Sequence, residues 1–247
     1  MKNSLVEFDS PAEKAHYVRE MFDRISPRYD LMNRVMTAGQ DVKWRRLAIE
    51  KSELPKAGKL LDIACGTGDL AFTALKKKPA LVAAADFSLK MVSLGKNKLN
   101  GYETIHFLGA DALSMPFHDN SFDAVVTGFS MRNVIDVSQF LAEMARVVRP
   151  GGKVVNLEIT PLQNPFLKTL FGFYFHKIVP LIGGLLSQNR EAYTYLPQSV
   201  DVFLTAEQLK EKMEAVCLQE VNYQKLNMGT VALHWGTVGS GESMSLR

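Results

Sequence analysis

The sequence is poor in the features that mark secreted, membrane-spanning and metal-binding proteins. It has only two cysteines, Cys65 and Cys217, which lie far apart without zinc spacing, so we expect two buried, reduced thiols and no metal site. No apolar run reaches the roughly 18 residues that a membrane-spanning helix needs. The first residues are polar and lack the apolar core of a signal peptide, which predicts a cytoplasmic protein.

A strong charge of either sign is also absent. The chain has 29 lysines and arginines against 26 aspartates and glutamates, which gives a formal net charge of +3. This small excess does not favour nucleic acid as a partner, but it is compatible with peripheral contact at the inner face of an anionic membrane. With 47% hydrophobic and 22% charged residues, the 247-residue chain fits one large globular α/β domain.

What the sequence does contain is a change of hydrophobic period along its length. Residues 1–51 carry apolar side chains at helical spacing, interrupted at Pro27, and predict an N-terminal helical cap. In residues 52–238, short apolar runs alternate with helical stretches, which predicts βαβ units and a mostly parallel sheet. Residues 239–247 are mostly small and polar and predict a disordered tail.

Two further segments belong to this α/β pattern. Residues 161–200 form an aromatic, mostly helical insertion. A helix follows whose N-cap is Thr205, with Gln208 in the position that completes a capping box. The last two strand-like runs are joined through residues 227–229, which predicts an antiparallel hairpin at the end of the sheet.

A glycine turn connects the first predicted strand to its helix, in the sequence LLDIACGTGDL of residues 60–70. Gly66 and Gly68 let a ligand approach the backbone closely and adopt dihedral angles that other residues avoid. Ala71 also satisfies the last position of the dinucleotide-binding pattern G-x-G-x-x-G/A, so the loop alone does not exclude a phosphate ligand. The alternative is a tight strand-to-helix connection that binds nothing.

Acidic residues end the next two predicted strands. Asp86 follows the glycines by about 20 residues, where a carboxylate accepts hydrogen bonds from ribose hydroxyls. Alternatively, Asp86 caps the helix that begins near Ser88. Asp111 and Ala112 follow the third strand, at the edge where ligands bind in open α/β sheets. Asp111 can accept a hydrogen bond from an adenine amino group there, or form a local Asx-turn.

Together these residues resemble the nucleoside-binding half of class I methyltransferases. The resemblance extends to residues 116–117, residues 120–123 and the Arg-Pro-Gly-Gly turn at 149–152. It implies a Rossmann-like class I methyltransferase fold that binds S-adenosyl-L-methionine and releases S-adenosyl-L-homocysteine. The donor-binding residues that it implies are Asp62, Gly66, Thr67, Gly68, Asp86, Asp111, Ala112 and Gly128.

Further segments are similar to the ubiquinone/menaquinone biosynthesis C-methyltransferase family. They are residues 29–45, 128–134, 146–160, 195–200 and 229–234, so the resemblance spans most of residues 16–238. It implies a demethylmenaquinone methyltransferase-like enzyme that methylates a ring carbon of a reduced polyprenyl quinone. The acceptor is then either demethylmenaquinol or 2-methoxy-6-polyprenyl-benzoquinol, and the 195–200 segment favours the menaquinone precursor.

The sequence departs from this family's pattern at several positions. Thr37, Arg149 and Thr160 are conservative replacements of Ser, Lys and Ser. Asp41 stands where the family has His, which puts a proton-transfer role at that position in doubt. Ser130 stands where the family has Gly, and we expect it to narrow the substrate cleft.

For catalysis, the resemblance and the position after the fourth strand single out Arg132 and Asn133. A phenolic hydroxyl of the quinol must lose its proton before the ring carbon becomes a good nucleophile. Arginine stays protonated, so we expect Arg132 to stabilise the phenolate or orient a water molecule, with Asn133 orienting Arg132. The alternative is that Arg132 pairs with Asp136 or Asp111 at the surface.

Other residues leave alternatives open. His176 and His234 are candidate bases. The aromatic side chains of the insertion either line a channel for the isoprenoid tail or pack on the sheet, and their helix can touch the bilayer surface. These side chains are Phe166, Phe171, Phe173, Tyr174 and Phe175. A homodimer is also compatible with the sequence.

Three other functions fit parts of the pattern. A small-molecule O- or N-methyltransferase would share the fold and the donor residues. A nicotinamide-dependent oxidoreductase would use the glycine turn together with Asp86. A non-catalytic subunit that binds a nucleoside would need the same residues without the catalytic pair.

Overall fold

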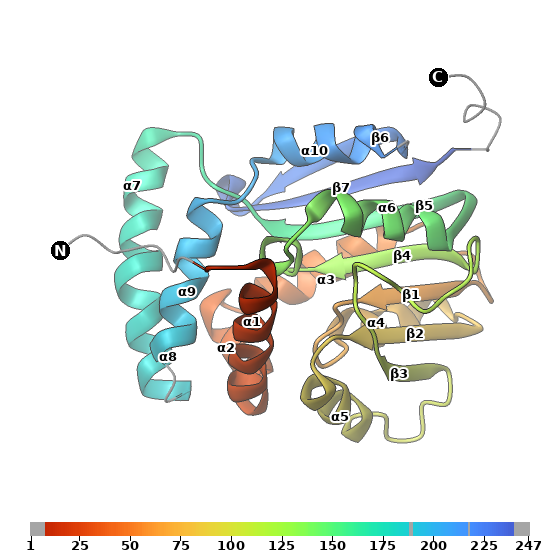
Figure 1. The fold of residues 1–247 in the computed structure, drawn as a ribbon, viewed down its shortest axis with the longest axis horizontal. Helices are drawn as coiled ribbons and strands as arrows, with labels where there is room; N and C mark the ends of the chain where they lie inside the picture. Colours follow the sequence, from red (N-terminus) through yellow and green to blue (C-terminus); the bar gives the residue numbers. More distant parts are fainter. Residues whose placement is uncertain (1–7, 188–189, 217, 240–247) are drawn as a thin grey trace.

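The computed structural model describes residues 8–187, 190–216 and 218–239, and Figure 1 shows a central sheet with helices on both faces and at one end. The expectations for Cys217 and for the tail from residue 240 onward lie outside these residues. Among the helices of the described ranges, none has the length and apolar character that crossing a membrane requires.

The described strands form one seven-stranded sheet in the order β3-β2-β1-β4-β5-β7-β6. β1 to β5 run parallel, and β7 runs antiparallel to both β5 and β6. The strands are β1 (Lys59–Ile63), β2 (Leu81–Asp86), β3 (Ile105–Gly109), β4 (Phe122–Gly128), β5 (Val148–Ile159), β6 (Leu218–Leu226) and β7 (Val231–Val238). The predicted parallel sheet with a closing antiparallel hairpin is therefore confirmed.

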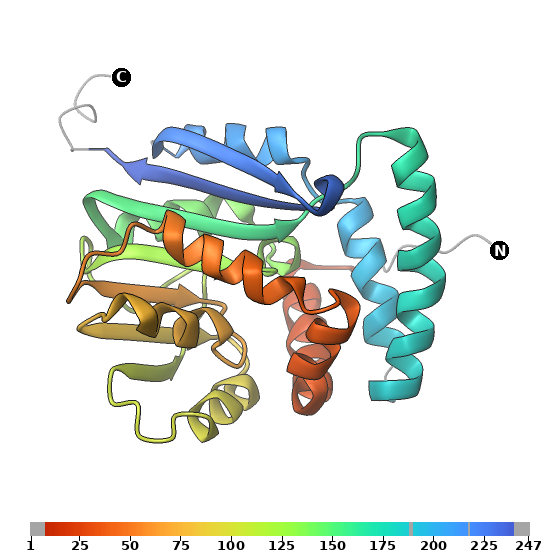
Figure 2. The same cartoon turned by 180° about the vertical axis from the view of Figure 1, so that it is seen from behind.

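The central strands are apolar along their length because helices cover both of their faces. On one face, the core contains Trp44 of α3, Leu70 of α4 and Val92 of α5. On the other face, it contains Phe140 of α6 and Leu209 of α10. Figures 1 and 2 show these two faces. The helices are α3 (Gln40–Lys51), α4 (Asp69–Ala74), α5 (Leu89–Asn97), α6 (Val137–Val147) and α10 (Ala206–Ala215).

Local sequence signals set where these helices begin. In α10, the Thr205 hydroxyl accepts from the Gln208 N–H at 3.2 Å, and the Gln208 side chain accepts from the Thr205 N–H at 2.9 Å. The predicted capping box is thus confirmed. Pro27 lies in a 3-10 turn, Ser26–Arg28, that separates the first two helices.

A second group of helices gathers at the carboxyl ends of the parallel strands (Figures 1 and 2). Met32, Val179 and Tyr193 meet in a core of their own there, so the start of the chain packs against the insertion. The helices are α1 (Pro11–Ile25), α2 (Tyr29–Met36), α7 (Pro165–Phe173), α8 (Val179–Ser187) and α9 (Arg190–Asp201), with a π-helical turn (Tyr174–Ile178) between α7 and α8. This group encloses the edge of the sheet at which ligands bind in open α/β folds.

Candidate active site

Two adjoining cavities lie where the strand order reverses between β1 and β4, the usual ligand position of open α/β sheets. The loop cavity, about 160 Å³, is lined by α1 and by the loops that follow β1, β2, β3 and β4. The helical cavity, about 320 Å³, lies among α1, α2, α3 and the insertion helices. Phe22, Tyr29, Phe129 and Asn133 line both cavities, and we call these four residues the shared wall.

The structure brings most of the predicted donor residues to the loop cavity. Its walls include Gly66 after β1, Asp86 at the end of β2, Asp111 and Ala112 after β3, and Gly128 at the end of β4. These residues come together because the carboxyl ends of parallel strands share one edge. The sequence positions alone were sufficient to place them.

Asp86 is held by the backbone on both of its oxygens. Oδ2 accepts from the Gly66 N–H at 2.7 Å, and Oδ1 accepts from the Ser88 N–H at 2.8 Å. Burial raises the pKa of Asp86 to about 6, although these two bonds favour the ionised form. The N-cap of α5 is Ser88, whose hydroxyl accepts from the Met91 N–H, so Asp86 supports the helix start without being its cap.

Asp111 lies in the cavity wall and also makes the local turn considered above. Its Oδ1 accepts from the Leu113 N–H at 2.9 Å, which is an Asx-turn. The turn engages one oxygen and leaves further acceptor capacity on the carboxylate. The turn and a ligand contact are therefore compatible at Asp111.

Asp62, Thr67 and Gly68 lie outside the wall of the loop cavity and hold the glycine loop in shape. The fully buried Asp62 accepts from the Ala71 N–H at 2.9 Å, and burial raises its pKa to about 8. Gly68 has φ +89°, and a Cβ there would lie 2.5 Å from the ring of Phe107. The predicted contacts of these residues with the donor stay predictions, and what the structure shows for them is a supporting position.

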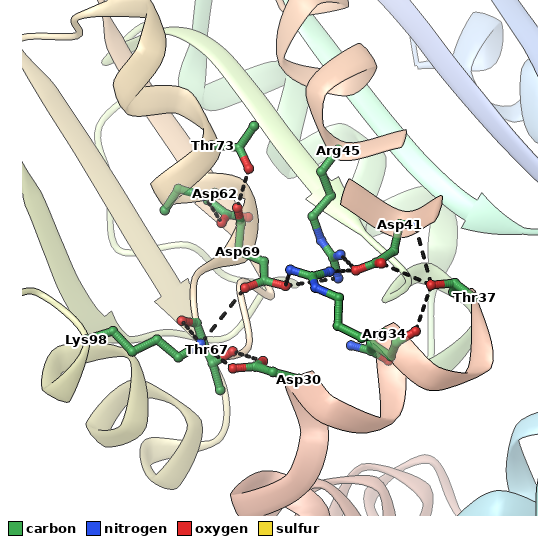
Figure 3. Close-up of polar contacts among 12 residues, drawn as sticks. Asp30, Arg34, Thr37, Asp41, Arg45, Asp62, Thr67, Asp69, Thr73 and Lys98 are labelled. Carbon is green, nitrogen blue, oxygen red and sulfur yellow. Dashed lines mark hydrogen bonds and ion pairs between the residues drawn. The ribbon is translucent and has the colours of Figure 1, made fainter. Parts of the chain in front are cut away.

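A network of charged side chains connects the N-terminal helices to the glycine loop (Figure 3). Its acidic members are Asp30, Asp41 and Asp69, and its basic members are Arg34, Arg45 and Lys98. Asp30 also accepts a hydrogen bond from the Thr67 hydroxyl at 2.5 Å. The three acidic side chains balance the three basic ones. The network therefore holds α2 and α3 against the glycine loop and carries no net charge itself.

This network explains the departure at Asp41. The Asp41 side chain is fully buried in the wall of the helical cavity and contacts both Arg34 and Arg45. A buried carboxylate requires such partners because desolvation alone would strongly penalise its charge. Asp41 is therefore fixed as an ion-pair partner, which agrees with the doubt about proton transfer at this position.

The glycine loop is poorly suited to a phosphate ligand. Its Gly66 N–H donates to Asp86, its Gly68 N–H donates to a backbone carbonyl, and the Ala71 N–H donates to Asp62. A pyrophosphate would thus find these amides engaged and carboxylates beside them. Asp86, whose pKa of about 6 leaves it mostly ionised at neutral pH, favours a ligand that carries positive charge, as a sulfonium amino acid does.

Arg132 lies in the wall of the helical cavity with its side chain 7% exposed, and its partner is Glu158. Nη1 lies 2.5 Å from Glu158 Oε1 and donates to the Phe129 carbonyl at 2.8 Å. The alternative that Arg132 pairs with Asp111 or Asp136 at the surface is wrong, because the guanidinium is buried against a fully buried glutamate. The buried Nε atom of Arg132 has no hydrogen-bond partner among the described residues.

Asn133 occupies the shared wall. Its Nδ2 lies 3.5 Å from the Phe129 carbonyl that also binds Arg132, so the two side chains share one acceptor. Its buried Oδ1 has no hydrogen-bond partner among the described residues. Buried polar atoms are usually paired, so this acceptor and the donor Arg132 Nε are exceptions among the described residues.

Sequence reasoning missed Glu158 and Tyr29. Glu158 is the last but one residue of β5, and a carboxylate near the carboxyl end of a parallel strand was the signal that could have identified it. Tyr29 is half-buried in the shared wall, and desolvation raises the pKa of its hydroxyl. Tyr29 opens the 29–45 segment of the family resemblance, but its role went unnoticed because α2 reaches the wall only through tertiary packing.

The two histidine alternatives lie outside both cavities. His176 lies 3.0 Å from Asp201 on α9, and its side chain is 29% exposed. His234 is fully buried on β7 with Nε2 2.8 Å from the Ala206 carbonyl, and burial lowers its pKa to about 4. In the described ranges, no group of three or more His, Cys, Asp or Glu side chains is arranged to hold a metal ion.

The aromatic side chains of the insertion divide between two environments. Phe171, Tyr174 and Phe175 line the helical cavity, as a channel for an apolar tail would require. Phe166 and Phe173 are 76% and 63% exposed and contact neither the cavity nor the sheet core. Both alternatives drawn from the sequence, cavity lining and packing on the sheet, therefore fail for the second pair.

Ser130 lies in the loop cavity, not in the helical one. Its hydroxyl is 2.6 Å from that of Thr127, and it is 8% exposed. The expected narrowing of the substrate cleft by Ser130 stays a prediction, and what the structure shows is that its side chain adds volume on the loop side of the shared wall.

Comparison with known proteins agrees with this geometry. A demethylmenaquinone methyltransferase from Roseiflexus sp. (strain RS-1) is 40% identical over 227 residues, which cover 92% of this chain and 95% of that one. A ubiquinone/menaquinone biosynthesis C-methyltransferase UbiE from Desulfotalea psychrophila is 42% identical over 220 residues, 89% of each chain. The chain is thus similar to these relatives over nearly its whole length.

A solved structure shows the same fold at much lower identity. A SAM-dependent methyltransferase from Thermotoga maritima, described as a possible histamine N-methyltransferase, superposes with a TM-score of 0.64 at 17% identity, over 89% of this chain and 99% of that one. This likeness confirms the class I methyltransferase fold. The family model of the ubiE/COQ5 methyltransferase family matches residues 11–238, and the chain therefore belongs to that family.

Proposed function

We propose that the protein transfers the methyl group of S-adenosyl-L-methionine to an aromatic ring carbon of a reduced polyprenyl quinone. The observation that carries this proposal is the shared wall, which separates a cavity edged by carboxylates from a larger apolar one. A donor in the first cavity and a quinol ring in the second would meet at Tyr29, Phe129 and Asn133. The names of the two relatives, which concern demethylmenaquinone and ubiquinone/menaquinone, support this substrate class.

The loop cavity fits a cationic nucleoside. Asp86 keeps acceptor capacity for ribose hydroxyls after binding two backbone N–H groups, and Asp111 keeps it for an adenine amino group. Gly66, Ala112 and Gly128 present little or no side chain and leave the space that a ligand needs. When bound, the donor supplies an electrophilic methyl group on a sulfonium.

Arg132 is the residue that we assign to the acceptor. In the reaction, a quinol hydroxyl gives up its proton, and the ring carbon gains the methyl group as the methyl–sulfur bond breaks and S-adenosyl-L-homocysteine leaves. The ring C–H proton then leaves to restore aromaticity and the oxygen regains a proton, so one proton is released overall. Arg132 stays protonated and stabilises the oxyanion through its unpartnered Nε edge, while Glu158 holds the opposite edge of the guanidinium. Asn133 Oδ1 is placed to accept from a second ligand group at the shared wall.

The helical cavity favours an apolar ring with an isoprenoid tail. Phe171, Tyr174 and Phe175 line it from the insertion, and Tyr195 and Leu196 line it from α9. Tyr195 and Leu196 belong to the 195–200 segment that favours a menaquinone precursor, so we propose demethylmenaquinol as the preferred acceptor. Because such a tail partitions into lipid, we also propose peripheral contact with a membrane.

The test is turnover with purified protein, the methyl donor and chemically reduced short-tail demethylmenaquinol or methoxybenzoquinol. We expect mass spectrometry and NMR to show one new methyl group on a ring carbon, with faster turnover of the naphthoquinol. An O-methylated product, or none with either quinol, would overturn the proposal. Quinones extracted from cells that lack the protein should contain the corresponding demethylated precursor.

A further inference from the structure

α7, the π-helical turn and α8 form a continuous helical rod at the outer edge of the molecule (Figures 1 and 2). The inner side of this rod contributes Phe171, Phe175 and Val179 to the helical cavity. An amphipathic surface helix would normally present polar residues on its opposite side. The rod does not follow this rule.

The opposite side of the rod is apolar as well. Phe166, Leu170, Phe173 and Leu181, which we call the outer face, are 76%, 61%, 63% and 62% exposed. The first three are spaced by four and three residues, so they lie on one side of α7. The described residues leave most of the surface of these four side chains uncovered, and such clustered apolar exposure marks a contact with something else.

The charged residues of the rod itself are all of one sign, and Asp201 of the neighbouring α9 reaches it only at His176. Between Ile159 and Arg190 the sequence has no Asp or Glu, in a chain that contains 26 of them. Lys177 on the π-helical turn is exposed, and so is Lys168 on α7, which lies two residues from Phe166 and Leu170 and therefore on the other side of that helix. Lys177 comes four residues after Phe173 and four before Leu181, so a cation interrupts the apolar stripe.

We propose that the outer face docks on an anionic lipid bilayer. Helices that lie on membranes bury an apolar face roughly 5–10 Å deep and attract acidic headgroups with lysines. This partner suits Lys177, whose long stem can lie along the apolar face while its ammonium group reaches the headgroups. The inference rests on the proposed quinol substrate for its purpose, because one rod would then contact the bilayer with one side and the tail-binding cavity with the other.

A second copy of the chain fits the outer face less well. In a two-fold pair, the same patch meets itself, so Lys177 would face its own copy without an acidic residue of the rod to pair with. Like charges placed opposite one another oppose association. Dimerisation is therefore the outcome that the test must distinguish from lipid binding.

The experiment is co-sedimentation of the full chain with vesicles of equimolar phosphatidylcholine and phosphatidylglycerol. The apolar variant is Phe166→Ser/Phe173→Ser, and its matched control is Leu89→Ser/Tyr102→Ser, which removes two exposed apolar side chains near α5. We expect the apolar variant to lose at least about tenfold in vesicle partitioning while the control binds as the wild type does.

A charge variant tests the lipid headgroup. We expect Lys177→Glu to lose binding to the anionic vesicles, whereas the surface control Lys76→Glu keeps it. All four variants should turn over a short-tail quinol in solution at the wild-type rate. With a long-tail quinol embedded in the vesicles, only the two outer-face variants should be slower.

The outcomes separate this inference from the proposed function. Wild-type partitioning by the apolar variant would overturn the docking face. A wild type that stays in the supernatant when the vesicles are sedimented would overturn it too. This includes the case in which the protein without vesicles is a dimer that Phe166→Ser/Phe173→Ser dissociates. Vesicle binding that depends on the outer face, combined with no turnover of any quinol, would uphold the docking face and refute the proposed function alone.

Discussion

The loop cavity and the helical cavity adjoin at one wall, yet their polar atoms are satisfied in opposite ways. On the loop side, Asp86 already binds the N–H groups of Gly66 and Ser88. On the helical side and at the wall, Arg132 Nε and Asn133 Oδ1 are buried without a partner among the described residues. Each such atom costs roughly 1–3 kcal/mol, and Asp62 Oδ1, behind the wall of the loop cavity, is a further one. Apart from Asn133, no side chain in the wall of the loop cavity has an unpaired buried polar atom among the described residues, so we expect a ligand to complete the helical side rather than the loop side.

The largest expected effect is the loss of donor binding when the loop cavity is filled. Gly66 has φ +55° in the cavity wall, so Gly66→Val would place a β-branched side chain where it resists the backbone conformation and fills the space of the donor. We expect calorimetry to detect no binding of S-adenosyl-L-homocysteine. Normal binding by this variant would mean that the donor lies elsewhere.

Gly68→Val is the control for that experiment. A Cβ at Gly68 would lie 2.5 Å from the Phe107 ring, so we expect a lower unfolding temperature as the main consequence. The pair thus separates a glycine that a ligand needs from one that packing needs. Thermal melts of both variants, measured with and without the ligand, check the distinction.

The loop cavity could be predicted from the sequence because its residues follow strand ends. Position along the chain is then enough, since parallel strands bring Gly66, Asp86 and Asp111 to one edge without further information. The direction in which each side chain points was harder to infer. Asp62 belongs to the same motif, but its side chain points into the core and accepts from Ala71, so a motif alone does not show which members face the ligand.

The helical cavity could not be predicted in the same way. Glu158 meets Arg132 across 26 residues, and Tyr29 reaches the shared wall from the other end of the chain. Such contacts depend on how helices pack at the sheet edge, which hydrophobic spacing does not specify. The insertion shows this most clearly, because Phe171 faces the cavity and Phe173, two residues on, faces away from it.

The next largest effect concerns the acceptor side. Arg132→Ala removes the cation at which phenolate charge develops, so we expect turnover to fall on the order of 100-fold or more. Donor affinity should stay near the wild-type value, because Arg132 lines only the helical cavity. Arg132→Lys should recover little if the planar fork matters.

A pH series sharpens the Arg132 prediction. As pH rises, a quinol hydroxyl ionises without help, so the alanine variant should recover part of its lost turnover relative to the wild type. If Arg132→Ala keeps the wild-type turnover, or if it weakens donor binding without lowering turnover, Arg132 does not stabilise the phenolate. Melting curves are needed as well, since removing Arg132 leaves Glu158 buried without its partner.

A smaller effect is expected on the donor side from Asp86→Ala. Loss of a charge-assisted ribose contact costs about 1.5–3 kcal/mol, which corresponds to a roughly 10- to 150-fold loss of donor affinity. The pKa of Asp86 is raised to about 6, so in the wild type the carboxylate is lost as pH falls through 6. Donor affinity should then fall towards tenfold per pH unit below that value.

Asp86→Asn is the matched control for the pH dependence, because it keeps the shape of the side chain and cannot titrate. Its donor affinity should be weaker than that of the wild type at pH 8 and nearly flat between pH 8 and 5. A variant that follows the wild-type pH profile would assign the titration to another group. Affinity unaffected by Asp86→Ala in a folded protein would leave Asp86 as a support for the start of α5 only.

The smallest effect is expected from Glu158→Gln, and it tests whether the acceptor side works as one unit. The Glu158 carboxylate accepts hydrogen bonds from Arg132 and from the Ile159 N–H, and neither residue lines the loop cavity, so we regard it as a positioning residue. The glutamine keeps an acceptor for Arg132 Nη1 and removes the charge that holds the guanidinium. We expect kcat to fall about tenfold, with KM and donor affinity unchanged, because a charge-assisted bond is roughly twice as strong as a neutral one.

A double-variant cycle decides between positioning and general support. If Glu158 acts only through Arg132, then Glu158→Gln should cost no further turnover in the Arg132→Ala background, since residues that act as a unit are not additive. It should even raise the unfolding temperature of that background, because an unpaired buried carboxylate is replaced by a neutral amide. Additive losses of kcat would instead show that Glu158 contributes to catalysis independently of Arg132. Equal losses of stability in both backgrounds, without a change in kcat, would reduce Glu158 to a structural role.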